Sequence, residues 1–181
     1  MANILTSLIK TVITGFLLLF AIIFLISNIT EFYFDYGFIT FLFRWLHVLA
    51  GIMWIGLLWY FNFVQIPSMP SIPDEQKPAV SKFIAPKALF WFRWGAVATL
   101  ATGLILAHLN GYLHDAMILN TNNAKYFMIG IGMWLGIIMA FNVWAIIWPN
   151  QKKALGIISV DASEKAAAAK KAMLFSRTNT L

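Results

Sequence analysis

The chain has 181 residues, of which 61% are hydrophobic and 11% are charged, and its formal net charge is +6. Soluble domains are about half apolar and a quarter charged, so this composition indicates a membrane protein. The chain contains no cysteine, which excludes an internal disulfide framework, a zinc–thiolate site, an iron–sulfur cluster and covalent haem attachment. The basic residues lie between apolar segments and in the tail, a distribution that does not indicate nucleic-acid binding.

Four apolar segments are predicted to cross the bilayer as helices, because each has close to the ~20 residues needed for a ~30 Å hydrocarbon core. The predicted spans are residues 11–29, 40–64, 88–109 and 126–148. The first is too long for the apolar part of a signal peptide, and no small-x-small cleavage site follows it, so it is interpreted as an anchor. We therefore expect an all-α integral membrane four-helix bundle over residues 1–150.

Basic residues predict the orientation of the bundle, since cytoplasmic loops carry the excess of lysine and arginine. The loops at residues 28–39 and 110–124 carry no lysine or arginine and are predicted to lie outside. The loop after the second span and the tail are basic: they carry Lys77, Lys82, Lys87, Lys152, Lys153, Lys165, Lys170, Lys171 and Arg177. This pattern predicts that both termini are cytoplasmic.

Prolines and the tail complete the predicted topology. The prolines from Pro67 to Pro86 are expected to end the second helix, and Pro149 is expected to stop the fourth. Residues 151–181 are predicted to form a basic cytoplasmic tail whose segment DASEKAAAAKKAMLF is helical, with Asp161 or Ser163 as its N-cap. Its alanine and lysine content favours a solvated helix or linker.

His47 is the most informative residue of the chain. It lies in FLFRWLHVLAGIMWIGLLWYF, ~10 Å inside the predicted outer end of the second span. An ionisable side chain at that depth indicates a functional site. Gly51 and Trp54 share its helix face, and the glycine would leave room for a flat macrocycle. The alternative is a neutral histidine hydrogen-bonded to a neighbouring helix.

A second histidine, His108, ends the third span at a membrane level within about one helical turn of His47. Two neutral imidazoles facing each other across a bundle could ligate a non-covalent haem b, so His47 and His108 are the predicted metal ligands. His108 could equally be an interfacial residue in contact with water. Arg44 could pair with a haem propionate or snorkel to lipid headgroups, and His114 is a solvated loop residue held in reserve.

Several further residues are assigned to packing. Gly132-x-x-x-Gly136, preceded by Gly130, is expected to let the fourth helix approach a neighbour closely. Asn62 and Asn142 could hydrogen-bond across the bundle, and Arg93 is expected to snorkel to the cytoplasmic surface.

Four stretches of the chain resemble a known family. They are RWLHVLAGIMWIG (44–56), FRWGAVATLATG (92–103), NVWAIIWPNQKKALG (142–156) and the closing SRTNTL (176–181). Together they resemble the membrane domain at the N-terminus of the bacterial cytochrome-c-type urate oxidases, over roughly residues 40–181. The histidine-bearing helix is also similar to that of small membrane protoporphyrinogen oxidases and of copper-resistance membrane proteins.

The resemblance implies a bacterial inner-membrane bundle associated with haem-linked electron transfer, with His47 at the position of the family's intramembrane histidine. In that family SRTNTL leads into further membrane helices and the proteins carry a C-terminal cytochrome c domain, so we expect a half-length relative or a subunit of a larger assembly. The predicted cofactor is haem b, and the predicted partners are the lipid bilayer, other membrane subunits or further copies, and a quinone or cytochrome. The alternatives are a haem-dependent oxidase of the urate or protoporphyrinogen type and a non-catalytic structural subunit. A metal transporter is disfavoured by the lack of cysteine.

Overall fold

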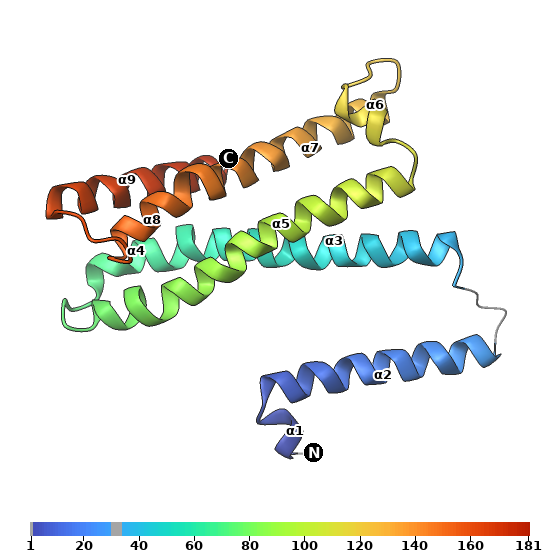
Figure 1. The fold of residues 1–181 in the computed structure, drawn as a ribbon, viewed down its shortest axis with the longest axis horizontal. Coiled ribbons are helices and arrows are strands. Elements are labelled where there is room, and N and C mark those ends of the chain that lie inside the picture. Colours follow the sequence, from blue (N-terminus) through green and yellow to red (C-terminus); the bar gives the residue numbers. More distant parts are fainter. Residues whose placement is uncertain (1, 30–33) are drawn as a thin grey trace. The chain divides into compact units, whose positions relative to one another are not determined.

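The computed structural model describes residues 2–29 and 34–181, and it is helical with connecting turns throughout that range (Figure 1). Four of its helical stretches are long and apolar enough to cross a membrane: Leu8–Ile29, Tyr36–Ser71, Ala79–Leu109 and Ala124–Ala154. The predicted all-α fold with four spans is therefore confirmed, and the chain is a multi-pass membrane protein. Part of the predicted first loop, residues 30–33, lies outside the described residues.

The chain divides into two compact units, Met1–Ile39 and Thr40–Leu181. The first contains α1 (Ala2–Leu5) and α2 (Leu8–Ile29). The hydroxyl of Thr11 donates to the carbonyl oxygens of Ile4 and Ser7, each at 3.0 Å, which ties the short helix to the long one. No residue of α2 is buried within the chain, so its apolar surface is available to lipid.

The second unit contains the remaining spans and the tail. In chain order its elements are α3 (Tyr36–Trp59), η1 (Tyr60–Gln65), α4 (Ile66–Ser68), η2 (Met69–Ser71), η3 (Ala79–Ile84), α5 (Ala85–Leu109), α6 (Leu113–Met117), α7 (Ala124–Phe141), η4 (Asn142–Ile147), α8 (Trp148–Ala154) and α9 (Ala162–Thr178). Helix α5 runs antiparallel to α3 and α7 (Figure 1). The buried core includes Trp54, Leu58, Phe61, Leu89, Phe92, Val143 and Ile147.

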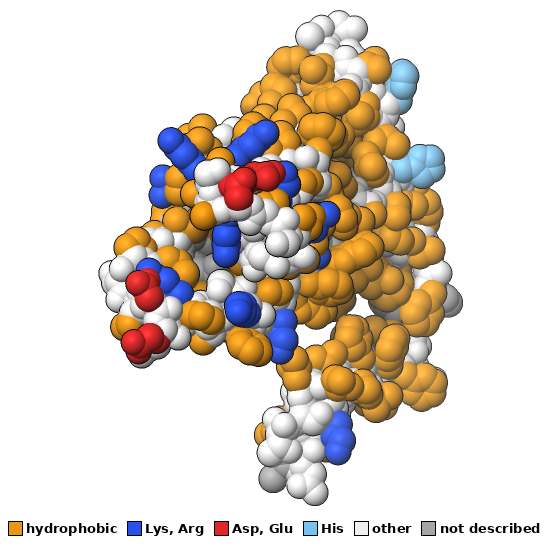
Figure 2. Space-filling view, turned by 60° about the vertical axis from the view of Figure 1, so that its left-hand side comes forward, with side chains coloured by type: hydrophobic (Ala, Val, Ile, Leu, Met, Phe, Trp, Pro, Cys, Tyr) orange, Lys and Arg blue, Asp and Glu red, His pale blue; other side chains and the backbone are white. Residues whose placement is uncertain are grey.

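One end of this unit carries most of its lysines, and we call it the basic end. Lys77, Lys82 and Lys87 lie there with Lys152 and Lys153, around the turn between η2 and η3 and along α8. Figure 2 shows most of the charged side chains gathered on that end, and a largely hydrophobic surface along the flank of the same unit. A charged end and an apolar flank are typical of a bundle that stands in a bilayer.

The prolines do not end the helices, so that prediction is wrong for Pro67 and Pro149. The second span continues to Ser71 and the fourth to Ala154. Three π-helical segments, η1, η3 and η4, each end two residues before a proline, namely Pro67, Pro86 and Pro149. A proline has no N–H and its ring crowds the carbonyl four residues earlier. A wider π turn relieves that crowding, so the chain passes through each proline without leaving the helix.

Helix α9 begins at the predicted cap. The Asp161 carboxylate accepts hydrogen bonds from the Ser163 hydroxyl at 2.6 Å and from the Glu164 backbone N–H at 2.7 Å. These bonds hold the pKa of Asp161 below its ordinary value of 3.8. The Lys153 ammonium lies 2.5 Å from the Glu164 carboxylate and ties the start of α9 to α8. Asp161 is thus confirmed as the N-cap.

The tail helix is packed, and the expectation of a solvated helix or linker is wrong. Ala168, Ala172 and Ser176 of α9 are buried, and α9 contacts α8, η4 and η1. Small side chains let two helices approach closely, which explains why an alanine-rich segment docks so well. The alanine content that indicates a solvated helix therefore also supplies a packing face.

Amide hydrogen bonds fix the position of this helix. Asn142 donates to the Asn179 side-chain oxygen at 2.9 Å, and Asn179 donates to the Met139 carbonyl at 3.0 Å. Asn62 donates to the Ser176 hydroxyl oxygen at 2.8 Å. The two asparagines of the spans therefore bond to the SRTNTL segment, each from a π-helical turn.

Candidate functional site

His47 projects from α3 onto the backbone of α5. Its Nδ1 lies 3.0 Å from the carbonyl oxygen of Thr99 and 3.3 Å from the hydroxyl oxygen of Thr102. A carbonyl oxygen can only accept, so Nδ1 carries the proton and donates it to Thr99. This contact is the hydrogen bond to a neighbouring helix that the sequence analysis gave as the alternative for His47. It also leaves the lone pair on Nε2, which has no hydrogen bond from the described residues.

Gly103 makes room for the imidazole beside α5. A Cβ atom at this position would lie 2.8 Å from Cε1 and 3.2 Å from Nδ1 of His47. Those distances are shorter than normal van der Waals contacts, so a larger residue would displace the ring. A second close approach occurs two turns earlier on α5, where a Cβ on Gly95 would lie 3.3 Å from the backbone nitrogen of Trp54. Glycines on α5 thus set how near α3 can lie.

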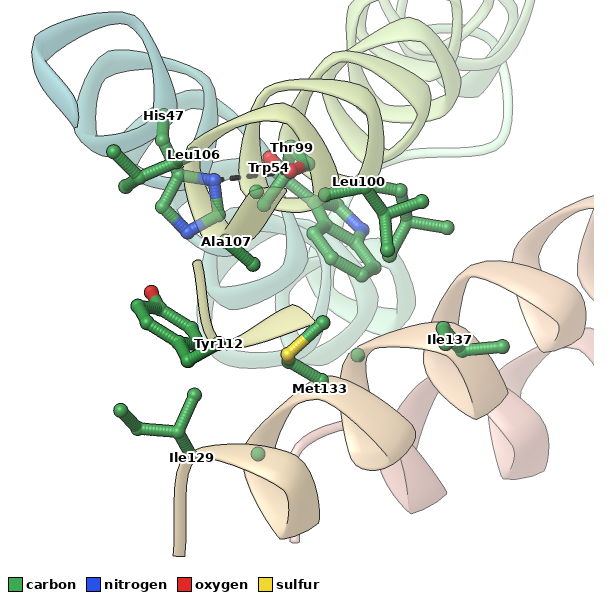
Figure 3. A pocket seen from close by; sticks show the side chains of 14 residues that line it. His47, Trp54, Thr99, Leu100, Leu106, Ala107, Tyr112, Ile129, Met133 and Ile137 are labelled. Atoms are coloured by element: carbon green, nitrogen blue, oxygen red, sulfur yellow. Dashed lines mark hydrogen bonds between the residues drawn. The ribbon is translucent and has the colours of Figure 1, made fainter. Parts of the chain in front are cut away.

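The free side of His47 borders a cavity of about 360 Å³ between α3, α5 and α7. Its volume falls within the ~300–1,000 Å³ typical of small-molecule sites. The lining is His47, Trp54, Thr99, Leu100, Gly103, Leu104, Leu106, Ala107, Tyr112, Ile129, Gly132, Met133, Gly136 and Ile137. Figure 3 shows the second imidazole nitrogen on the side that faces Tyr112, while Met133 and Ile129 rise from α7 on the far wall.

The polar groups of this cavity are few. Apart from His47 and the Thr99 carbonyl that holds it, they are the Tyr112 phenol and the indole N–H of Trp54. The Trp54 Nε1 atom is buried and has no hydrogen-bond partner among the described residues. A mostly apolar cavity with a few converging polar groups is the usual composition of a site for a hydrophobic cofactor or ligand.

The close helix approach predicted for the glycines of the fourth span is confirmed at Gly130, whereas Gly132 and Gly136 lie at the cavity. Gly132 and Gly136 line the cavity, and a Cβ on Gly132 would have no atom within 4 Å. The close helix approach lies at Gly130, where an added Cβ would clash with the carbonyl oxygen of Ala116. The Gly132-x-x-x-Gly136 face therefore keeps one wall of the cavity flat and open.

No protein-family model matches the chain, and no curated protein or solved structure matches it.

The predicted site residues are distributed unevenly around this cavity. His47 and Trp54 belong to its lining. Gly51 has open space beside its Cα but lies outside the lining, and Arg44 is exposed. His108 is exposed on α5 and is not brought to the cavity. The predicted pairing of His47 with His108 thus has no support from the positions of the two side chains.

Thr99, Gly103, Tyr112 and Met133 are among the site residues that were not found from the sequence. Thr99 and Gly103 lie one turn apart on α5, a spacing that favours one shared face. That spacing places both residues on one face of α5, but it does not predict which helix packs against this face. The register of α5 against α3, which decides that His47 meets Thr99, is a tertiary property.

Arg93 forms a separate feature near the basic end. Its side chain is 8% exposed, and its guanidinium carbon lies 3.4 Å from the centroid of the Trp148 ring and 5.8 Å from that of Trp144. Its Nε and Nη1 atoms have no hydrogen-bond partner among the described residues. Cation–π contact therefore stabilises this arginine, in place of the predicted exposure to the surface.

The described residues contain no cluster of side chains that would bind a metal ion on its own. Within residues 2–29 and 34–181, no group of three or more histidine, aspartate or glutamate side chains could hold a metal ion. A haem iron differs because the macrocycle supplies four ligands and the protein supplies one or two.

Proposed function

We propose that the chain is a membrane haem b protein of electron transfer. The observation that carries the proposal is the state of His47, whose Nδ1–H is fixed on the Thr99 carbonyl and whose Nε2 lone pair borders an apolar cavity. Histidines that bind metals usually donate their other N–H to a carbonyl or carboxylate, which fixes the tautomer and raises the basicity of the ligating nitrogen. His47 has that arrangement in place.

The residues of the cavity fit a non-covalent haem. Gly132 and Gly136 put no side chain on one wall, Gly103 admits the His47 ring, and the remaining lining is largely apolar. Haem b, when bound, supplies one-electron chemistry at its iron. The chain's own residues would orient the His47 ring, keep water from the site and set the polarity around it, which are the factors that tune a haem potential.

If the haem takes a second ligand from the protein, that ligand would come from the far wall of the cavity or from outside the lining. We propose Met133 for this role, because it extends from α7 on the wall across from His47 (Figure 3). A thioether is neutral, so it needs no compensating charge in an apolar cavity, and Met/His ligation occurs in haem proteins. His108 remains the ligand predicted from the sequence, and its use would require its exposed side chain to reach the cavity.

The wider assignment rests on the distribution of charge and on the family resemblance. The lysines of the basic end support a bacterial inner-membrane protein with both termini in the cytoplasm. Arg44, at the opposite end of α3, is proposed to pair with a haem propionate. The proposed partners are a quinone or cytochrome that exchanges electrons, and further membrane subunits or copies of this chain. In this proposal the chain is a subunit or half-length relative of the urate oxidase membrane domain.

The test is a visible spectrum of the natively purified chain before and after dithionite. We expect a Soret band that shifts on reduction, and we expect His47→Ala to lose it. His114→Ala is the matched control, since His114 is exposed and lies outside the cavity lining, and it should keep the haem. Absence of haem in the wild-type chain, or equal haem content in His47→Ala, overturns the proposal.

The same preparation tests the second ligand and the kind of activity. Met133→Leu should change the Soret position and the reduction potential, and His108→Ala should leave both unaltered; the reverse pattern would assign the position to His108.

Reduction of the haem by urate or by protoporphyrinogen would make the chain an oxidase. Co-purification with other membrane proteins and without haem would make it a structural subunit.

A further inference from the structure

A second cavity, of about 440 Å³, lies at the basic end. It shares no lining residue with the cavity beside His47. Residues from η1, α4, α5 and α8 line one part of it, and the tail helix α9 closes it with Ala169, Lys170, Ala172, Met173 and Ser176. The cavity therefore depends on the docking of the tail.

Two unsatisfied amides mark this cavity. The Oε1 atoms of Gln65 and Gln151 are buried and have no hydrogen-bond partner among the described residues. Both residues line the cavity, one from the end of η1 and the other from α8. A buried acceptor without a donor costs free energy. A ligand that donates a hydrogen bond to either amide oxygen would recover that cost.

A hydroxyl on the tail adds a third polar group. Ser176 is 4% exposed, lines the cavity, and accepts a hydrogen bond from Asn62 at 2.8 Å. Because its oxygen already accepts, its O–H is the group left to donate. The cavity thus offers acceptors from two helices and one buried hydroxyl from a third.

The rest of the lining restricts the class of ligand. It contains no carboxylate, so it does not suit a metal ion or an organic cation. Its one charged residue is the exposed Lys170, and its other walls include Phe61, Leu89 and Met173. These features favour an uncharged, lipid-soluble molecule with hydroxyl groups on its head.

A glutamine amide can hydrogen-bond to both the hydroxyl form and the carbonyl form of a ligand. Its oxygen accepts from a hydroxyl and its NH₂ donates to a carbonyl, and rotation of the terminal torsion exchanges the two. Gln65 and Gln151 could therefore hold a hydroquinone through O–H donors and the matching quinone through N–H donors. A group that must bind in two protonation states needs this adaptability.

We propose that the cavity at the basic end binds the head ring of a lipid-soluble quinol or quinone. The choice of a quinol over another hydroxylated lipid rests on the proposed electron-transfer function. Gln65 and Gln151 bind the ring oxygens, Ser176 adds a hydroxyl, and the apolar walls hold the ring. The cavity lies where the spans end at the basic end, within reach of a molecule dissolved in that side of the bilayer.

The test measures binding of a short-chain hydroquinone and of its quinone to the full chain in phosphatidylcholine nanodiscs, by calorimetry. We expect saturable binding of both forms to the wild type. Gln65→Leu and Gln151→Leu should each raise the Kd about tenfold, because a leucine of similar volume keeps the packing but removes the amide. Gln76→Leu, at an exposed glutamine in the turn, is the matched control and should bind as the wild type does.

A second variant, Ala169→Phe, fills the cavity from α9 without removing a polar group, and it should abolish binding. Equal affinity in the wild type and in the two cavity variants, or uptake that only follows lipid partition, overturns the proposal. Equal competition by a diacylglycerol would assign the site to lipid hydroxyls and likewise overturns it. Haem content is measured in the same samples: quinol binding without haem overturns the proposed function alone, and haem without quinol binding overturns this inference alone.

Discussion

His47 illustrates how a single contact decides the chemistry of a residue. The same imidazole satisfies an interhelical hydrogen bond through Nδ1 and retains a lone pair on Nε2. The two interpretations of a histidine inside a membrane span, a packing residue and a ligand, are therefore compatible. What distinguishes them is whether the free nitrogen borders a cavity or a wall of side chains, and here it borders a cavity.

Gly103 is predicted to be essential for the position of that ring. Gly103→Ala places a Cβ 2.8 Å from Cε1 of His47, so the imidazole must move or α3 must shift. Overpacking of this kind costs about 1–3 kcal/mol. We expect a lower free energy of unfolding in mixed micelles, together with a loss of the haem that is proposed to bind beside His47.

Gly132→Ala is the matched control for this prediction, because Gly132 lines the same cavity and an added methyl group there meets no atom within 4 Å. Its stability should stay within about 0.5 kcal/mol of the wild type. Equal stability of the two variants would mean that the imidazole does not lie against α5.

At the scale of elements, the prolines and the tail act together. Each π-helical segment accommodates a proline, and two of the three segments also carry an asparagine that bonds to the tail. A π turn changes the direction in which its side chains and carbonyls point relative to a regular helix. We infer that the widened turns orient Asn62 and Asn142 toward α9 as well as relieving the prolines.

The amide pair between Asn142 and Asn179 is predicted to anchor the tail. Asn142→Ala leaves a buried amide oxygen without its donor, a loss of about 1–3 kcal/mol. The double variant with Asn179→Ala should lose less than the sum of the single variants, with a coupling of about 1 kcal/mol. Unfolding titrations in mixed micelles measure all three.

Asn150→Ala serves as the control for this cycle, since Asn150 bonds only to the Ile146 carbonyl of its own helix. It should show no coupling to Asn179→Ala. A coupling of zero between Asn142 and Asn179 would contradict the docked position of the tail.

Local patterns predicted what is local in this fold. Apolar runs predicted four spans and the residues around Asp161 predicted a helix cap, because both depend on neighbours in sequence. The docking of α9 joins Asn62 to Ser176 across 114 positions, and nothing near either residue indicates the other. The cavity likewise requires the register of three helices, so His47 was predicted as a site residue and Thr99 and Met133 were not.

For the whole molecule, the positive charge should decide the orientation in the membrane. Most lysines of the second unit lie at its basic end, whereas at the opposite end the loop at residues 110–124 contains none and Lys125 lies in the first turn of α7. Short cytoplasmic loops retain lysine and arginine, so the basic end should face the cytoplasm. The quinol cavity would then open to the inner leaflet and the His47 cavity would lie nearer the outer one.

Single-cysteine labelling tests this orientation, since the natural chain has no cysteine and each variant carries one thiol. Asn122→Cys, Ser71→Cys and Ala167→Cys are all at exposed positions and alter no charge. A membrane-impermeant maleimide should label Asn122→Cys in intact cells and the other two only after permeabilisation. Equal labelling of all three in permeabilised cells controls for reactivity. Labelling of Ser71→Cys and Ala167→Cys in intact cells would invert the topology and place the His47 cavity toward the cytoplasm.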